Sequence, residues 1–225
     1  MFLGATSAAL VAGTAHADGV TGATVDNENH RDLGTVWMSG TDDPNPHTTL
    51  IGLLPPKSEG ELWTYCIQET VRIEPSELYD EKDWATESGI TGIDAPHLQA
   101  IKWILNNSYP QLDVAALGTA AHIKGLTPQE AVAGTQAAIW TFSDVSGKAK
   151  LDADKQDLKD HAVTVLYNYL MEAAKGHTSD SDQPTASLGL APLQSTTPKA
   201  GDKVGYKVMS SDTTDAFSIA LADNK

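Results

Sequence analysis

The chain has 225 residues, 40% of them hydrophobic, which is enough for one large domain or for one domain and part of a second. Its 15 basic and 30 acidic residues give a formal net charge of −15 at pH 7. Because such a surface repels a phosphate backbone, we expect no nucleic-acid partner. The sequence contains no cluster with metal-ligand spacing and no glycine-rich phosphate loop, so it predicts neither a metal nor a cofactor.

The first 17 residues have the composition of a signal peptide. Residues 2–15 are small and apolar, and Ala15-His16-Ala17 has the A-x-A form of a signal-peptidase site. A run of about 14 apolar residues is too short to span a bilayer as a helix. We therefore expect export, removal of residues 1–17, and no membrane insertion of the mature chain. No basic residue precedes the apolar run, so we expect this signal peptide to be truncated at its N-terminus.

Two strands that suit a hairpin are predicted next, at Thr48–Leu54 and Leu62–Ile73, with a turn-rich segment at residues 55–60 between them. A period of two places Cys66 on the more polar face of the second strand. The opposite, apolar face consists of Trp63, Tyr65, Ile67, Val71 and Ile73.

Three helices are predicted after the strands. Asp94 is a suitable N-cap for a helix over residues 95–107. Thr127, Pro128 and Glu130 form a capping-box sequence that opens a helix running to about Phe142. A third helix is expected over residues 155–175.

The chain changes character near residue 178. Residues 176–187 are polar and turn-rich, and short strand-like pieces follow at Val204–Val208 and Ala216–Ala222. We therefore expect a main domain over residues 18–178. Residues 179–225 would hold a linker and the start of a β-sandwich domain, with too few strands to complete it.

Two residues raise a chemical question. Cys66 is the only cysteine of a chain predicted to be exported, where cysteines usually pair. Gln136 shares the apolar stripe of the capped helix with Val132, Ile139 and Trp140. Periodicity alone leaves two interpretations open: an inert buried thiol with a hydrogen-bonded core amide, or a reactive pair.

Local sequences favour the reactive pair. Tyr65-Cys66-Ile67 and residues 135–140 (TQAAIW) resemble the paired motifs of the thioester domains of Gram-positive surface adhesins. Residues 101–110 (IKWILNNSYP) and 125–131 (GLTPQEA) resemble the segments that precede the Gln motif in that family. The resemblance covers roughly residues 35–175. Residues 197–224 are similar, less closely, to the start of the Ig-like stalk domains that follow such modules.

The resemblance implies an α+β fold: a β-sheet or β-sandwich-like body with a helical subdomain packed against it, then the start of an Ig-like β domain. It also implies that Cys66 and Gln136 join in an internal thioester, which reacts once with a lysine amine of a host or surface protein. Such a module is extracellular and attached to the cell wall through a C-terminal region, and it is not an enzyme. We expect Tyr65, Ile67, Thr135 and Trp140 to wall the site, and we consider His122 for proton transfer.

Two other functions remain open on the sequence. A transglutaminase-like cysteine acyltransferase would use Cys66 with His97, His122 or His161, and its acyl group would come from a substrate glutamine. A purely structural stalk segment would contain an inert thiol.

The predicted export has a direct test. Cleavage after Ala17 would give a secreted chain that begins at Asp18. N-terminal sequencing of surface-exposed protein should find this residue, and retention of Phe2 there would contradict the prediction.

Overall fold

The computed structural model describes residues 2–3, 8–11, 20–27, 31–56, 61–81, 92–156, 161–178, 188–192 and 206–210. For residues 2–3, 8–11, 31–33, 81, 188–192 and 206–210 it describes only the backbone. The chain divides into two compact units, one of Met1–Gly13 with Val20–Ser181 and the other of Thr14–Gly19 with Asp182–Lys225.

The first unit contains an antiparallel sheet. Along its main path the strand order is β3-β6-β7-β2-β1-β8, and β4 also pairs with β6. A separate pair is formed by β5 and β9. The strands are β1 (Phe2–Leu3), β2 (Ala8–Val11), β3 (Thr24–Val25), β4 (Arg31–Thr35), β5 (Met38–Ser39), β6 (His47–Leu54), β7 (Leu62–Cys66), β8 (Asp80–Glu81) and β9 (Lys150–Leu151).

The predicted hairpin is confirmed, with one change in length. β6 and β7 are antiparallel and pair Ile51 with Thr64 and Leu53 with Leu62. The prediction that the second strand reaches Ile73 is wrong, because β7 ends at Cys66 and a turn follows in which Val71 N–H donates to the Gln68 carbonyl. A period-two pattern runs on through this turn, which periodicity alone does not mark.

The predicted export segment contributes strands to the sheet of the whole chain. β2 pairs with β7, placing Ala9 opposite Cys66 and Val11 opposite Thr64. Cleavage after Ala17 stays a prediction, and it would remove this neighbour of β7. The carboxyl end of β7 would then lose its strand partner on one side.

Among the described residues, the helices of the first unit are α2 (Ala95–Asn106), α3 (Val114–Ala120), α4 (Pro128–Ser143) and α5 (His161–Lys175). The predicted caps are present: Asp94 accepts a hydrogen bond from His97 N–H, and Thr127 and Glu130 form the capping box. Helix α3, capped by Asp113, was not predicted. The third predicted helix does not begin at Lys155, because the backbone N–H of Lys155 donates to Asp152 in a turn.

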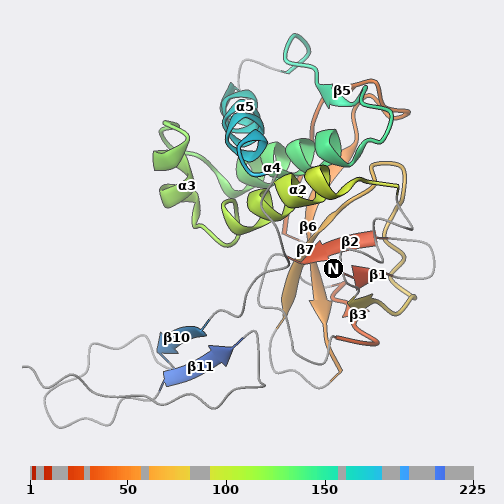
Figure 1. Ribbon diagram of the computed structural model, residues 1–225, viewed down its shortest axis with the longest axis vertical. Coiled ribbons are helices and arrows are strands. Elements are labelled where there is room, and N and C mark those ends of the chain that lie inside the picture. The colour runs from red at the N-terminus through yellow and green to blue at the C-terminus, as the bar shows by residue number, and fades with distance from the viewer. Residues whose placement is uncertain are drawn as a thin grey trace, which may run out of the picture. The chain divides into compact units, whose positions relative to one another are not determined.

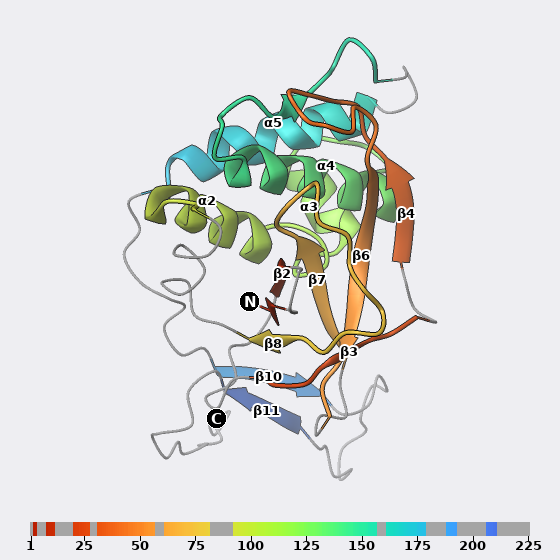
Figure 2. The same ribbon diagram turned by 90° about the vertical axis from the view of Figure 1, so that its right-hand side faces the viewer.

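Helix α4 is the centre of the hydrophobic core. All of residues 131–140 are buried. The helix contacts β4, β6 and β7 on the sheet side, and also α2, α3, α5 and β9. Figures 1 and 2 show α2, α4 and α5 stacked together beside the ends of β6 and β7. This combination of an antiparallel sheet with a separate helical layer confirms the expected α+β class.

The second unit, within the described residues, is a hairpin of β10 (Leu188–Pro192) and β11 (Tyr206–Ser210). β11 overlaps the strand predicted at Val204–Val208, whereas residues 216–222 lie outside the described residues. The Ig-like identity of this unit and the boundary near residue 178 stay predictions. No helix in the described ranges combines the length and apolarity needed to cross a bilayer.

Gly134 allows α5 to approach α4 closely. A Cβ atom at this position would lie 3.0, 3.1 and 3.2 Å from three side-chain carbons of the buried Leu166. Three contacts of this length on one side chain leave little room for an added methyl group.

We expect Gly134→Ala to destabilise the domain by about 1 kcal/mol. The gain in helix propensity, about 1 kcal/mol, is smaller than the roughly 1–3 kcal/mol that overpacking costs. In a Leu166→Ala background the same substitution should be stabilising, because the space is then free. Urea denaturation of the four chains tests this, and a stabilising Gly134→Ala in the wild-type background would contradict it.

Candidate functional site

Cys66 lies where β7 ends, opposite helix α4. Its side chain is partly buried, and it is the only cysteine of the chain. Burial raises the pKa of the thiol from its ordinary value of 9.0 to about 11, because a thiolate is poorly solvated there. At neutral pH this group is therefore a thiol, and its proton must leave before or during any attack by sulfur.

Gln136 presents its amide to Cys66 from α4. The side chain is only 1% exposed, so its polar atoms need partners inside the protein. Cys66 N–H donates to Gln136 Oε1 at 3.1 Å, and Gln136 Nε2 donates to the Cys66 carbonyl at 2.7 Å. The Gln136 amide therefore pairs with the Cys66 backbone through two hydrogen bonds, as the backbone of a neighbouring β-strand would.

This geometry prepares the amide for attack. The backbone N–H of Cys66 points at the carbonyl oxygen on which negative charge would develop. Because β7 and α4 fix the two residues from regular elements, their relative position is rigid. The sequence predicted that these two residues meet, and the structure brings them together across 70 positions of the chain.

The four expected wall residues are all buried, and their role as walls of the site stays a prediction. Tyr65 donates from its hydroxyl to the Tyr109 carbonyl at 2.7 Å and so ties β7 to the loop after α2. Ile67 and Thr135 are fully buried, and Trp140 is 4% exposed. Within the described part of the chain, Thr135 Oγ1 and Trp140 Nε1 have no hydrogen-bond partner.

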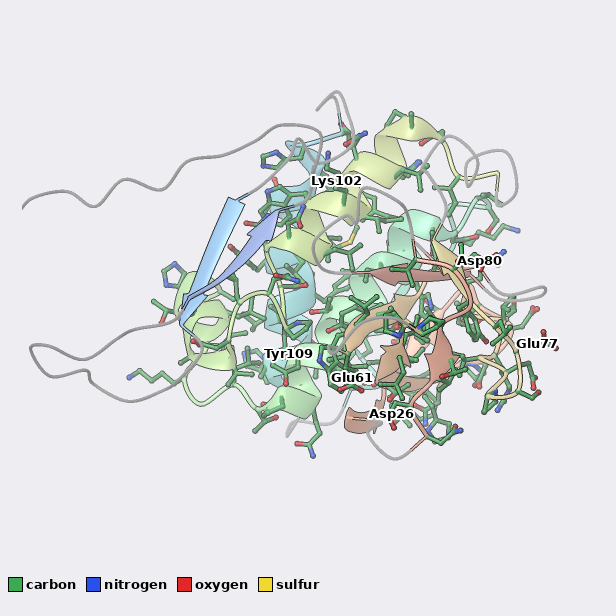
Figure 3. All side chains as sticks on the ribbon, turned by 90° about the horizontal axis from the view of Figure 1, so that it is seen from below. Asp26, Glu61, Glu77, Asp80, Lys102 and Tyr109 are labelled. Atoms are coloured by element: carbon green, nitrogen blue, oxygen red, sulfur yellow. The ribbon has the colours of Figure 1, made fainter. Side chains whose placement is uncertain are left out.

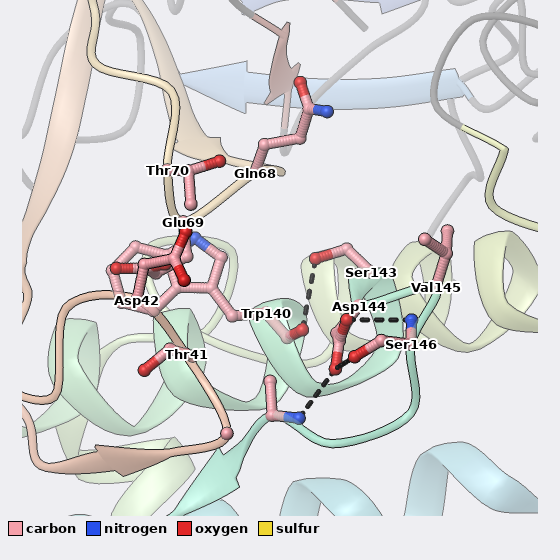
Figure 4. A pocket seen from close by; sticks show the side chains of 12 residues that line it. Thr41, Asp42, Gln68, Glu69, Thr70, Trp140, Ser143, Asp144, Val145 and Ser146 are labelled. Carbon is pink, nitrogen blue, oxygen red and sulfur yellow. Dashed lines mark hydrogen bonds between the residues drawn. The ribbon is translucent and has the colours of Figure 1, made fainter.

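A cleft with a volume of about 600 Å³ opens onto the thiol-bearing residue, and we call it the Cys66 cleft. Besides Cys66 and Trp140 it is lined by Asp42, Asp43, His47 and Glu69, among others. A second pocket of about 290 Å³ shares Asp42, Glu69, Thr70 and Trp140 with it. Figure 4 shows Asp42, Glu69 and the Trp140 ring in this second pocket.

The acidic lining was not predicted from the sequence. Asp42 and Asp43 belong to a loop that, in sequence, resembles any solvated turn, and their position beside Cys66 depends on tertiary contacts. Glu69 lies three residues after Cys66. This spacing did not indicate a shared cleft, because the strand was expected to continue to Ile73.

The histidines considered for proton transfer lie elsewhere. His122 is exposed just after α3, where its φ is 58°, and it does not line the Cys66 cleft. His97 is bonded to Asp94 on the surface, and His161 is exposed at the start of α5. His47 does line the cleft. Among the described residues, no group of three or more His, Cys, Asp or Glu side chains could hold a metal ion.

The raised pKa of the thiol can be measured in a Gln136→Ala chain, which lacks the amide partner. Its labelling rate with iodoacetamide should rise with pH beyond 9.0 and level off only near about 11. When the same chain is unfolded in urea, its labelling rate should level off near the ordinary thiol pKa of 9.0. Equal midpoints in the folded and unfolded chains would contradict burial of the thiol.

The chain matches a known protein family and is similar to a solved structure. The model of the thioester domain family matches residues 63–176, just over half of the chain. No curated protein matches the chain. Among solved structures, it is similar to the "Thioester domain of the Enterococcus faecium TIE86 protein", with 14% identity and a TM-score of 0.46. That alignment covers 91% of this chain and 64% of the other, so this chain spans less than two thirds of that structure.

The family match contains both Cys66 and Gln136 and includes most of β7 and all of α2, α3, α4 and α5. This chain belongs to the thioester domain family.

Proposed function

We propose that Cys66 and Gln136 condense into an internal thioester. The paired hydrogen bonds between the Gln136 amide and the Cys66 backbone carry this proposal, because they hold the amide of a buried glutamine against the residue that bears the only thiol. An amide is a poor electrophile, so the reaction depends on this fixed approach.

The proposed condensation balances without an added reagent. Sulfur bonds to the side-chain carbonyl carbon of Gln136, the carbon–nitrogen bond breaks, and ammonia leaves with the thiol proton. The Cys66 N–H stabilises the oxygen of the tetrahedral intermediate. The raised pKa of the thiol supports a route in which the proton moves to the leaving nitrogen as sulfur attacks.

The thioester would then capture an amine. A lysine side chain of a host or surface protein attacks the same carbonyl carbon, forms an isopeptide bond and releases Cys66 as a thiol. Each domain reacts once, so the module is a covalent binder and not a turnover enzyme. With the predicted signal peptide, this suits a protein that is exported and attached to the cell wall.

Three substitutions separate the roles of the two residues. The wild-type chain should have an intact mass lower by one ammonia and should gain one methylamine on treatment. Cys66→Ala and Gln136→Ala should show neither change. Gln136→Glu should fold but not react, because an ionised carboxylate resists attack by sulfur.

Loss of the link should also lower stability. The cross-link closes a loop of 70 residues. The chain-entropy model gives up to roughly 4 kcal/mol for such a loop, less any strain.

Amine capture by Gln136→Ala that still requires Cys66 would overturn the proposal in favour of a cysteine acyltransferase.

A further inference from the structure

The Cys66 cleft opens from solvent onto the residue that carries the thiol. Cys66 lines this cleft, and the Gln136 amide is hydrogen-bonded to the Cys66 backbone. A bond between the two side chains would therefore lie at the cleft. The carboxylate of Glu69, three residues after Cys66, lines the same cleft and the adjoining pocket.

A buried donor in the cleft lacks a partner. Trp140 is 4% exposed, yet its indole N–H makes no hydrogen bond to any described residue. It lies one helical turn after Gln136, and helical side chains lean back over the preceding turn. Asp42 and Glu69 line the same two pockets as Trp140, and Figure 4 labels all three in one of them. Leaving such a donor unpaired costs about 1–3 kcal/mol, so an acceptor on a bound ligand would stabilise the site.

The charges around the cleft suit a cationic ligand. Asp42, Asp43 and Glu69 contribute three carboxylates, against the guanidinium of Arg72 and the imidazole of His47. Asp144, in the adjoining pocket, is already engaged, because its carboxylate accepts hydrogen bonds from Ser146, Lys148 and Ala149. The carboxylates of the cleft would attract the ammonium group of a lysine.

We infer that the Cys66 cleft receives the lysine of an extended protein segment, and that Glu69 is the general base that takes a proton from its ammonium group. This inference rests on the proposed thioester and adds the residue that activates the amine. The Trp140 N–H donates to a backbone carbonyl of the same segment.

The proton balance is complete. An ammonium group has no free electron pair, so the first proton passes to the Glu69 carboxylate and on to water. The neutral nitrogen then attacks the Gln136 carbonyl carbon, and the carbon–sulfur bond breaks. A second proton moves from nitrogen to the Cys66 sulfur, which leaves one amide N–H, one thiol and one proton released to solvent.

The surroundings of Glu69 strengthen it as a base. Burial raises the pKa of this carboxyl, and the charges of Asp43 and Asp42 raise it further, against a hydrogen bond from the Asp43 backbone N–H. A base with a higher pKa accepts a proton from an ammonium group more readily. Glu69 acts only when ionised, so its contribution is present above its raised pKa and is lost as pH falls through that value.

The test compares Glu69→Gln with Glu77→Gln in the full chain. Glu77 is an exposed carboxylate that does not line the Cys66 cleft, and Figure 3 shows it at the edge of the molecule. Intact mass first establishes the thioester in each chain. Rates of adduct formation are then measured with methylamine, which is cationic at neutral pH, and with hydroxylamine, which is mostly neutral there.

Glu69→Gln should slow the methylamine reaction by about tenfold or more and leave the hydroxylamine rate within about twofold. Glu77→Gln should change neither rate. Equal slowing of both amines, or of neither, would overturn the role of Glu69. Loss of the thioester in Glu69→Gln would also overturn it, by placing Glu69 in bond formation. A wild-type chain that has not lost ammonia would contradict the thioester itself.

Two further experiments test Asp43 and Trp140, which line the Cys66 cleft with Glu69. The ratio of wild-type to Glu69→Gln methylamine rates should fall towards one at low pH, and Asp43→Asn should move this inflection to lower pH because it removes a negative charge. Trp140→Phe should slow Nα-acetyl-lysine-N-methylamide more than methylamine, since only the former carries backbone carbonyls. An unmoved inflection would contradict the coupling to Glu69, and equal slowing would contradict the Trp140 contact.

Discussion

A helix that runs through the middle of a domain has no solvent-exposed face, and this constraint shapes the rest of the structure. Residues 131–140 of α4 are all buried, so a polar side chain there must find a partner within the protein. Gln136 finds it in the backbone of β7. The packing that buries α4 therefore also fixes the amide against the residue that carries the thiol, and the site depends on the core.

The environment of the thiol also influences how long the bond would last. A thiol with a pKa of about 11 gives a poor leaving thiolate, so a thioester at Cys66 would resist attack by water. Capture then requires a stronger nucleophile, and a lysine is one only after it loses a proton. The acidic residues that line the Cys66 cleft and the poorly solvated sulfur of Cys66 would together favour amines over water as nucleophiles.

Much of this could be predicted from the sequence because it rests on local signals. The capping box at Thr127 and Glu130 fixed the start of α4 and therefore the phase of Gln136 on the helix. The motifs around Cys66 indicated its partner. The end of β7 at Cys66 was missed, because the alternation of apolar residues continues into the turn. The acidic cleft was missed as well, since Asp42, Asp43 and Glu69 come together only through the tertiary fold.

The position of Gln136 in α4 decides which part of the molecule would bear mechanical load. A ligand bonded to this side chain is joined to the C-terminal end only through the residues after 136. Strands β1 to β8 precede that point in the chain and lie outside the covalent force path. Tension would enter the domain at its most enclosed helix, which α2, α5 and the sheet hold on several sides. The sheet that supplied the thiol would be free of the pull once the bond to sulfur has been exchanged.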